Sequence, residues 1–270
     1  MNSSPRSDSN FMEPFDKDLL LKGAEALGVA LDAERLRLFE VFCEMLCEWN
    51  SKINLTSLKS REDIIIKHFI DSLTVFPIIQ KCLETGPEGR SGDIVPIIDV
   101  GSGAGFPSIP LKLAAGGFGL PWRFTAVDST GKKVNFIKEA ASALGFASSE
   151  FEPVHSRAED LAADRSYREK YRIAIARAVA PLPVLIEYCL PFVSLEGFFI
   201  AMKGTRETAR QEVDGSKKAL SELGGEIHDV TDLILPFTDN ARTVVTIRKF
   251  RHTSNIYPRK SGLPSKKPLK

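Results

Sequence analysis

From residue 94 to residue 249, short apolar runs alternate with amphipathic segments, and this alternation restricts the fold more than any other feature of the sequence. Short apolar runs predict strands, and segments with apolar residues three and four positions apart predict helices. The predicted strands are 94–99, 123–128, 150–154, 172–176, 197–203, 227–235 and 242–249, and the predicted helices are 107–115, 131–144, 157–163, 181–193 and 206–223. Strands that alternate with helices form a doubly wound, mostly parallel α/β sheet with helices on both faces. The last two strands leave no room for a helix between them, so we expect an antiparallel pair at one edge of the seven-stranded sheet.

The rest of the chain divides into shorter segments of different composition. Residues 1–14 are rich in Ser and Asn, and we expect them to be disordered. Residues 15–84 carry apolar residues at helical spacing and predict a helical subdomain. A linker at 85–93 joins it to the sheet domain, residues 94–250. Residues 251–270 contain three prolines and few apolar residues, so we expect this basic tail to form neither a helix nor a core of its own.

Charge is distributed unevenly along the chain. The formal net charge is +1, but the tail holds six basic residues and no acid, which leaves the rest of the chain at −5. This asymmetry favours a polyanionic partner. The six basic residues are Arg251, Arg259, Lys260, Lys266, Lys267 and Lys270.

Several classes of protein are disfavoured by what the sequence lacks. No apolar run reaches the roughly 18 residues of a membrane span, and the N-terminus has no apolar core of a signal peptide. We therefore expect a cytoplasmic protein with no membrane partner. The four cysteines and four histidines lack metal-ligand spacing, so we expect no metal site. Without a heptad repeat or an obvious apolar excess, we expect a monomer.

The segment 97–107, IIDVGSGAGFP, is a strand followed by a glycine-rich turn and a plausible helix start at Pro107. In a doubly wound sheet this turn lies at the carboxyl end of the first strand, where ligands bind. We expect the pocket to be built from the first four strands. Its predicted cofactor contacts are Asp99, Gly101, Gly103, Gly105, Phe106 and Asp128.

Two classes of cofactor use this layout. Dinucleotides require G-x-G-x-x-G, whereas the turn here reads G-x-G-x-G, with Phe106 where the dinucleotide motif has its last glycine. Asp128, at the end of the second strand, can accept hydrogen bonds from both ribose hydroxyls of an adenosine. Asp99 can lie beside an ammonium group, which S-adenosyl-L-methionine has and a dinucleotide lacks. The sequence favours S-adenosyl-L-methionine, and a nicotinamide cofactor is the alternative.

Beyond the turn, the sequence resembles the bacterial RsmG family, also called GidB, of guanine-N7 methyltransferases of small-subunit ribosomal RNA. The matching segments include WNSKINLTS (49–57), HFIDSL (68–73), IIDVGSGAGFPSIPL (97–111), VDSTGKKVNFI (127–137), HSRAEDL (155–161), ARAVAPL (176–182), AMKG (201–204) and YPRKSGLPSKKPL (257–269). The resemblance runs from Trp49 to the C-terminus, about four fifths of the chain. Two departures, Ser108 and the insert 115–121, lie beside the turn. The resemblance implies a class I methyltransferase fold that uses S-adenosyl-L-methionine and acts on small-subunit ribosomal RNA or an assembling small subunit.

The resemblance also implies roles for individual residues. Gly101 and Phe106 line the cofactor site, and Ala158 and Glu159 lie at the adenine. Arg177 faces the junction of cofactor and substrate and, with Lys203, is the candidate catalytic pair. Its charge within the apolar segment IAIARAVA also requires a partner or a site. His68 and Asp71 are expected to tie the helical subdomain to the sheet. The implied RNA-binding residues are Lys132, Arg157, Lys203 and Arg242.

The residues after the fourth strand discriminate between methyl acceptors. Transfer to exocyclic amines typically uses Asn/Asp-Pro-Pro-aromatic there, whereas this chain has Arg177-Ala-Val-Ala-Pro. Transfer to pyrimidine carbon 5 needs a cysteine nucleophile at a strand end, and Cys189 is expected in mid-helix. Guanine N7 carries a free lone pair, so catalysis there needs positioning rather than a general base. We expect Arg177 and Lys203 to bind O6 or phosphate.

Alternative functions remain open at this point. One is a nicotinamide-dependent oxidoreductase, and another is a non-catalytic RNA-binding assembly module that retains a cofactor pocket. A methyltransferase of small molecules is a further alternative, which the basic tail disfavours. Because N7 lies in the deep major groove of an RNA helix, a target guanine is expected in a loop, a bulge or a flipped-out position.

Overall fold

The computed structural model, which describes residues 13–58, 60–85 and 93–270, contains a seven-stranded sheet in the order β3-β2-β1-β4-β5-β7-β6. The strands are β1 Val95–Val100, β2 Trp122–Asp128, β3 Phe151–His155, β4 Tyr171–Arg177, β5 Val193–Lys203, β6 Gly225–Ile234 and β7 Ala241–Lys249. β1 to β5 pair in parallel, and β7 is antiparallel to both β5 and β6. The predicted doubly wound sheet and its antiparallel edge are confirmed.

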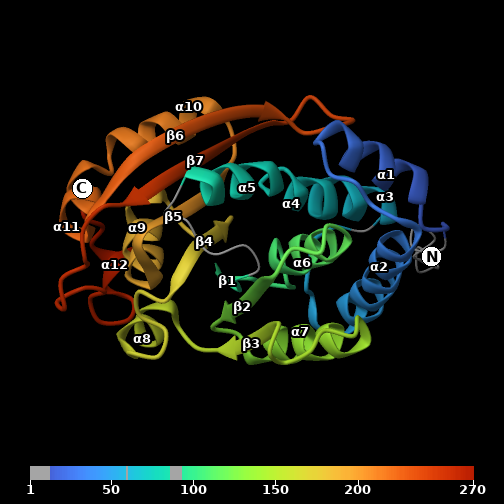
Figure 1. The fold of residues 1–270 in the computed structure, drawn as a ribbon, viewed down its shortest axis with the longest axis horizontal. Coiled ribbons are helices and arrows are strands. Elements are labelled where there is room, and N and C mark those ends of the chain that lie inside the picture. The colour runs from blue at the N-terminus through green and yellow to red at the C-terminus, as the bar shows by residue number, and fades with distance from the viewer. Residues whose placement is uncertain (1–12, 59, 86–92) are drawn as a thin grey trace, which may run out of the picture.

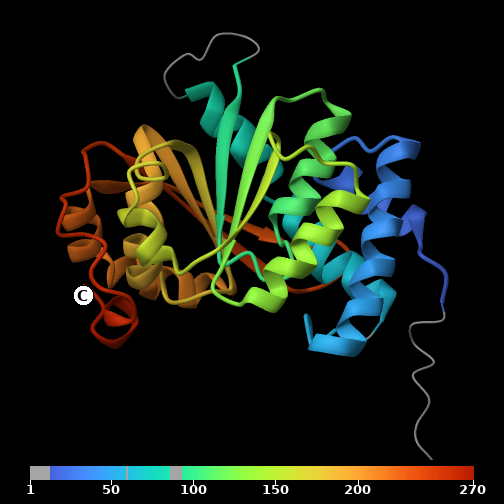
Figure 2. The same ribbon diagram turned by 90° about the horizontal axis from the view of Figure 1, so that it is seen from below.

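Helices cover both faces of this sheet (Figure 1). They are α1 Lys17–Ala26, α2 Ala33–Ile53, α3 Arg61–Ile64, α4 Asp71–Leu73, α5 Phe76–Thr85, α6 Ser108–Gly117, α7 Gly131–Ala143, α8 Ala158–Ala163, α9 Leu182–Cys189, α10 Arg206–Asp214, α11 Lys217–Leu223 and α12 Leu263–Lys266. Figure 2 shows α6, α7 and the N-terminal helices on one side of the sheet and α8, α9 and α11 on the other. The central strands β1 and β4 are therefore apolar along most of their length, because both of their faces are buried.

The N-terminal helices share one hydrophobic core with the sheet. Phe42 of α2 packs on Phe106 of the glycine turn and on Phe136 of α7, at ring-centroid distances of 5.4 and 6.2 Å. The side chains of Asp16 and Asp32 cap α1 and α2 by accepting from backbone N–H groups in the first turn. Between α3 and α4 the chain forms a π-helical turn, Ile65–Ile70, which the periodicity did not predict.

Two of the predicted helices are interrupted. The segment 181–193 ends as an α-helix at Cys189 and continues as a 3₁₀ turn, Leu190–Phe192, because Pro191 has no N–H to donate. The segment 206–223 breaks at Gly215 into α10 and α11. The expected disorder at 1–14 and the linker at 85–93 fall largely on residues 1–12 and 86–92, outside the described part of the chain.

The expectation that the basic tail forms no helix is wrong. Residues 263–266 form the short helix α12, with Pro264 in its first turn, where the missing N–H costs no hydrogen bond. Tyr257 and Leu269 are each only 7% exposed, so the tail packs on the body of the protein. Among the described helices, none combines the length and the apolar character needed to cross a membrane.

Candidate active site

The glycine-rich turn joins β1 to α6 and holds three glycines with positive φ. A side chain at Gly101 would place its Cβ 2.5 Å from Val179, and one at Gly105 would meet Ile109 at 2.4 Å. At Gly103, which has a φ of +59°, a Cβ would find nothing within 4 Å. The first and third glycines are thus required by packing, whereas Gly103 leaves its backbone open to a ligand.

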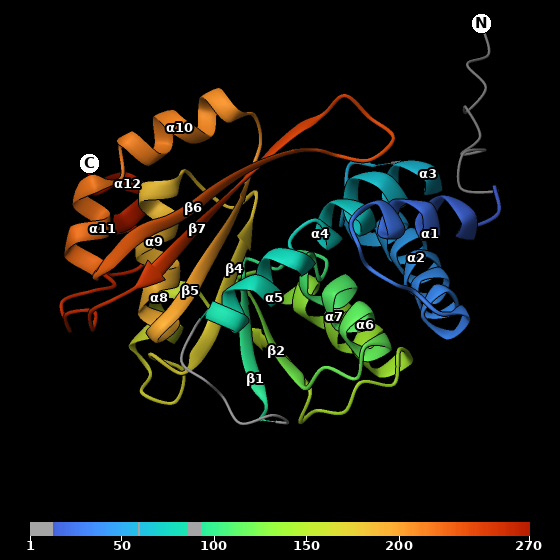
Figure 3. The same cartoon turned by 45° about the horizontal axis from the view of Figure 1, so that its top comes forward.

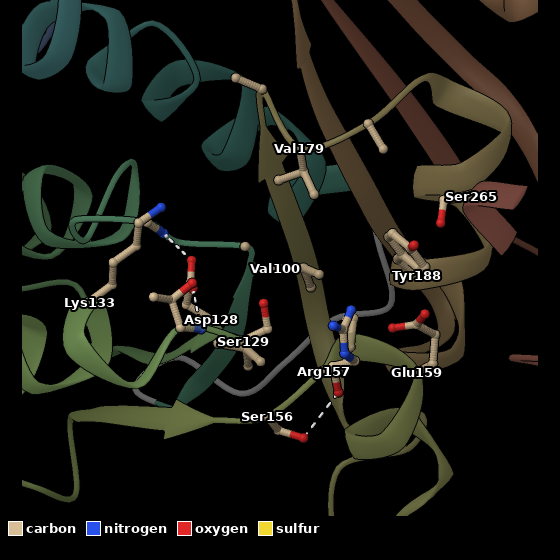
Figure 4. Close-up of a pocket in the computed structure, with 17 residues that line it drawn as sticks. Val100, Asp128, Ser129, Lys133, Ser156, Arg157, Glu159, Val179, Tyr188 and Ser265 are labelled. Atoms are coloured by element: carbon tan, nitrogen blue, oxygen red, sulfur yellow. Dashed lines mark hydrogen bonds between the residues drawn. The ribbon is translucent and has the colours of Figure 1, made fainter. Parts of the chain in front are cut away.

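A cavity of about 450 Å³ lies over this turn, at the carboxyl ends of β1 to β4 (Figure 4). We call it the strand-end cavity. Of the predicted cofactor contacts, it brings together Gly101, Gly103, Asp128, Ala158 and Glu159. The cavity is also lined by Val100, Val127, Ser129, Thr130, Lys133, Ser156, Arg157, Ala178, Val179, Ala180, Tyr188 and Ser265.

Asp128 is positioned by the backbone on both sides of the cavity. Its Oδ2 accepts a hydrogen bond from the N–H of Gly103 at 2.9 Å, and its Oδ1 accepts from the N–H of Thr130 at 2.8 Å. A carboxylate oxygen can accept more than one hydrogen bond. Asp128 is therefore held in place and retains lone pairs for a ligand with two neighbouring hydroxyls.

Asp99 lies beneath the turn and is fully buried. Its Oδ2 accepts from the N–H of Ser108 at 3.1 Å, but its Oδ1 has no hydrogen-bond partner. Burial raises the pKa of this carboxyl to about 7, although the polar groups of Ser108 oppose the shift. The hydroxyl of Ser108 is also buried without a hydrogen-bond partner, so two unpaired polar groups lie beneath the turn.

Phe106 does not line the strand-end cavity. Its ring stacks on His68 with a centroid distance of 4.5 Å and lies 5.2 Å from the guanidinium carbon of Arg177. It therefore connects the glycine turn to the helical subdomain. Asp99, Gly105 and Arg177, which were also predicted at the cofactor, lie outside the lining of this cavity as well.

A second cavity, of about 420 Å³, lies on the other side of the segment that follows β4. We call it the basic cavity, because four basic side chains line it: Lys67, Arg177, Lys203 and Arg242. The other lining residues are His68, Asp71, Ala178, Met202, Gly204, Thr208 and Glu212. Three residues with predicted catalytic or RNA-binding roles thus meet here. The two others are exposed and lie elsewhere, Lys132 at the start of α7 and Arg157 at the strand-end cavity.

The carboxylate of Asp71 holds two of these cations. Its Oδ2 lies 2.9 Å from Nη1 of Arg177, and its Oδ1 lies 2.6 Å from Nε of Arg242. Asp71 begins α4, whereas the arginines belong to β4 and β7, and Figure 3 shows the β6–β7 hairpin extending to the N-terminal helices. The predicted tie between the helical subdomain and the sheet is confirmed at Asp71.

His68 completes the surroundings of Arg177. The guanidinium Nη2 donates to Nδ1 of His68 at 3.1 Å, so the ring proton must lie on Nε2, which donates to Thr56 Oγ1 at 2.7 Å. Burial and the charge of Arg177 lower the pKa of His68 to about 3, so this ring stays neutral near pH 7. The π-helical turn also aims the carbonyl oxygen of Lys67 at Arg177, at 3.3 Å.

Lys203 stabilises the segment after β4, residues 178–180, which lies between the two cavities. Its Nζ donates to the carbonyl oxygen of Ala180 at 3.0 Å and lies 2.7 Å from Oε2 of Glu212. Ala178 lines both cavities and has a φ of +55°, which is unusual for a residue with a side chain. Such backbone strain is common at functional sites. Ligands in the two cavities would therefore meet at Ala178.

The sequence missed Lys67, Ala178, Thr208 and Glu212, because none of them carries a motif by itself. Cys189 closes α9 rather than lying in mid-helix, and it is fully buried. Among the residues that the structure describes, no group of three or more His, Cys, Asp or Glu could hold a metal ion.

Comparisons with known proteins show the family to which the chain belongs. Among solved structures, an rRNA methylase from Streptococcus thermophilus aligns with a TM-score of 0.43 at 19% identity, covering 64% of this chain and 93% of that chain. The ribosomal RNA small subunit methyltransferase G of Acetivibrio thermocellus is 46% identical over 94% of this chain and 96% of its own length. Its namesake from Alkaliphilus oremlandii is 40% identical over 94% and 99%. A sequence profile of GidB, rRNA small subunit methyltransferase G, matches residues 35–235. The chain belongs to this family, as its motifs indicated.

Proposed function

We propose that the protein transfers a methyl group from S-adenosyl-L-methionine to N7 of a guanine in small-subunit ribosomal RNA. The observation that carries this proposal is the pair of cavities that meet at Ala178, one at the glycine turn and one lined by four basic side chains. Membership of the rRNA small subunit methyltransferase G family supports the class of reaction and of substrate.

The strand-end cavity fits the proposed cofactor. Asp128 would hold the ribose hydroxyls, the open backbone at Gly103 would allow close approach, and Ala158 and Glu159 would lie at the adenine. The expected contact between Asp99 and the ammonium group lacks support, because Asp99 is fully buried and does not line the cavity. When bound, the cofactor supplies an electrophilic methyl group on a sulfonium.

The basic cavity suits an acceptor that needs no general base. His68 is neutral, and its Nδ1 already accepts from Arg177, so it is not available to remove a proton. Guanine N7 has no proton to remove, and the reaction then depends on positioning.

The carboxylates of the cavity suit the charge of the product. Methylation at N7 makes the guanine ring cationic, which a free arginine would oppose. Arg177 and Lys203 each lie within 3 Å of a carboxylate, Asp71 and Glu212 respectively. Their contacts use three of the five N–H donors of Arg177 and two of the three of Lys203, so the remaining donors can reach O6 or phosphate while the charges are largely neutralised.

The RNA strand would also contact basic residues outside the basic cavity. Lys132 and Arg157 are exposed, and so are four lysines of the C-terminal segment, Lys260, Lys266, Lys267 and Lys270. Arg259 is not available, because its guanidinium binds Glu187. The substrate would be small-subunit ribosomal RNA or an assembling subunit, which places the activity in the cytoplasm. A monomeric state remains a prediction.

Transfer of a radiolabelled methyl group tests the proposal. Purified protein and methyl-labelled S-adenosyl-L-methionine are incubated with deproteinised small-subunit RNA, with intact small subunits and with large-subunit RNA as a control. We expect label in at least one of the small-subunit substrates and none in the control. Binding of NADH without any labelled RNA would instead support the oxidoreductase, and cofactor binding without turnover on either substrate would support the assembly module.

A further inference from the structure

We propose that the C-terminal segment, residues 253–270, forms one wall of the strand-end cavity and that its docking and cofactor binding stabilise each other. This inference rests on the proposed function, because it takes the ligand of the cavity to be S-adenosyl-L-methionine. It corrects the expectation that the first four strands alone build the pocket, because Ser265 is part of the lining.

The segment reaches the cavity at two points. Ser265 of α12 lines it on the same side as Tyr188 of α9 (Figure 4). One residue before α12, the N–H of Gly262 donates to Oε1 of Glu159 at 2.8 Å. Glu159 is 6% exposed and lines the cavity, so the position of its carboxylate depends on a residue more than a hundred positions away.

An ion pair fastens the segment to the body just before these contacts. The carboxylate of Glu187, in α9, is fully buried, and both of its oxygens accept from the guanidinium of Arg259, with Nε at 2.8 and 3.1 Å. The backbone N–H of Arg259 donates to Oε1 of the same carboxylate at 2.8 Å. A fully buried carboxylate is costly without such partners. Without the segment, α9, which carries Tyr188, would contain an unpaired charge.

The side chain of Arg168 holds the first part of the segment by donating to backbone carbonyl groups of the segment. Its Nη1 donates to the carbonyl oxygen of Tyr257 at 2.8 Å, and its Nη2 donates to that of Thr253 at 2.8 Å. These carbonyl groups can accept from Arg168 only when the backbone of the segment has this conformation. The contacts therefore fix the backbone conformation of the segment as well as its position near Arg168.

Coupling follows from the two contacts at the cavity. A ligand that contacts Glu159 and Ser265 binds the protein more tightly when the segment is docked than when it is undocked. It must then shift the segment toward docking by the same free energy by which docking improves its affinity. The four exposed lysines lie on this segment, and none of them lines the cavity.

The test uses the full-length protein and S-adenosylhomocysteine as the probe. Ser265→Phe puts a large side chain on the wall of the cavity. Lys266→Phe puts the same side chain at the next position, which is also exposed but does not line the cavity. By titration calorimetry we expect Ser265→Phe to weaken binding at least tenfold and Lys266→Phe by less than twofold. In the wild-type protein, we expect saturating probe to slow amide hydrogen exchange across residues 260–267.

The possible results separate this inference from the proposed function. Wild-type binding that both variants retain, with no change in exchange at 260–267, would overturn the inference and leave the proposed function standing. Equal weakening by both variants would also overturn it, because the effect would not depend on the wall. Absence of probe binding to the wild-type protein would overturn the proposed function, and this inference with it.

Discussion

Replacing Asp71 by asparagine removes the one carboxylate that Arg177 and Arg242 share. The asparagine oxygen can still accept from one arginine, but its amide nitrogen cannot accept from the other. One hydrogen bond to a charged group is lost, worth about 1.5 to 3 kcal/mol. The Asp71 side chain is 7% exposed and that of Arg177 14%, so water cannot replace the lost partner fully. Breaking a buried pair from one side costs about 3 to 5 kcal/mol, and we expect a loss of about 3 kcal/mol.

Equilibrium urea unfolding at pH 7 measures this loss. The control is Glu48→Gln, which removes the partner of Lys52 in a pair whose side chains are 67% and 59% exposed, and which should cost less than about 0.5 kcal/mol. Arg242→Met should cost less than Asp71→Asn, because it leaves Asp71 paired with Arg177. If Asp71→Asn costs no more than the Glu48 control, the shared carboxylate does not hold the helical subdomain to the sheet, and our account of the basic cavity is wrong.

Further predictions concern the two cavities and the C-terminal segment. Gly103→Val should weaken S-adenosylhomocysteine binding at least tenfold in calorimetry, whereas Gly119→Val, which has the same positive φ and open surroundings outside the cavity, should not. The carboxyl of Asp99 has a pKa of about 7 in the folded protein and near 4 in the unfolded chain, so only the folded protein holds this proton between pH 4 and 7. The free energy of unfolding should therefore fall over this range by up to ~1.4 kcal/mol per pH unit. Urea titrations of Asp99→Asn should show no such dependence. Arg177→Ala should lower the rate of methyl transfer at least a hundredfold in a protein that still unfolds cooperatively; a near-normal rate would mean that Arg177 is only structural. Changing the four exposed lysines of the C-terminal segment to alanine should reduce the slope of log RNA affinity against log salt by about 2 to 3, at unchanged probe affinity.

The sheet could be predicted from the sequence because its signal is local. Each buried strand is a short apolar run with a helical segment before or after it, and the lack of a helix between β6 and β7 indicated their antiparallel pairing. The break at Gly215 could not be predicted, because a single glycine is tolerated within a helix.

The basic cavity could be predicted only in part, because its contacts are long-range. The motifs singled out Arg177, Lys203 and Arg242 one by one, and Asp71 was expected to tie the helical subdomain to the sheet. That its carboxylate joins Arg177 to Arg242 was not predicted, because Asp71 lies more than a hundred residues earlier in the chain than either arginine. The π-helical turn that brings Asp71 and His68 to Arg177 has no period that a hydrophobic pattern reveals.

The C-terminal segment was misjudged for a related reason. Its composition is that of a solvated arm, and nothing local shows that Arg259 has a buried partner in α9. The specific contacts, rather than apolar content, decide where it lies.

Mapping of 7-methylguanine in ribosomal RNA tests whether the protein methylates guanine at N7. Small-subunit RNA is treated with the protein and S-adenosyl-L-methionine, then with borohydride and aniline, which cleave the chain at 7-methylguanine. We expect one new cleavage at a guanine in an unpaired or opened position, absent with Arg177→Ala and absent when the cofactor is omitted. Methyl transfer without cleavage would contradict attack by N7, and no transfer to any small-subunit substrate would contradict the proposed function itself.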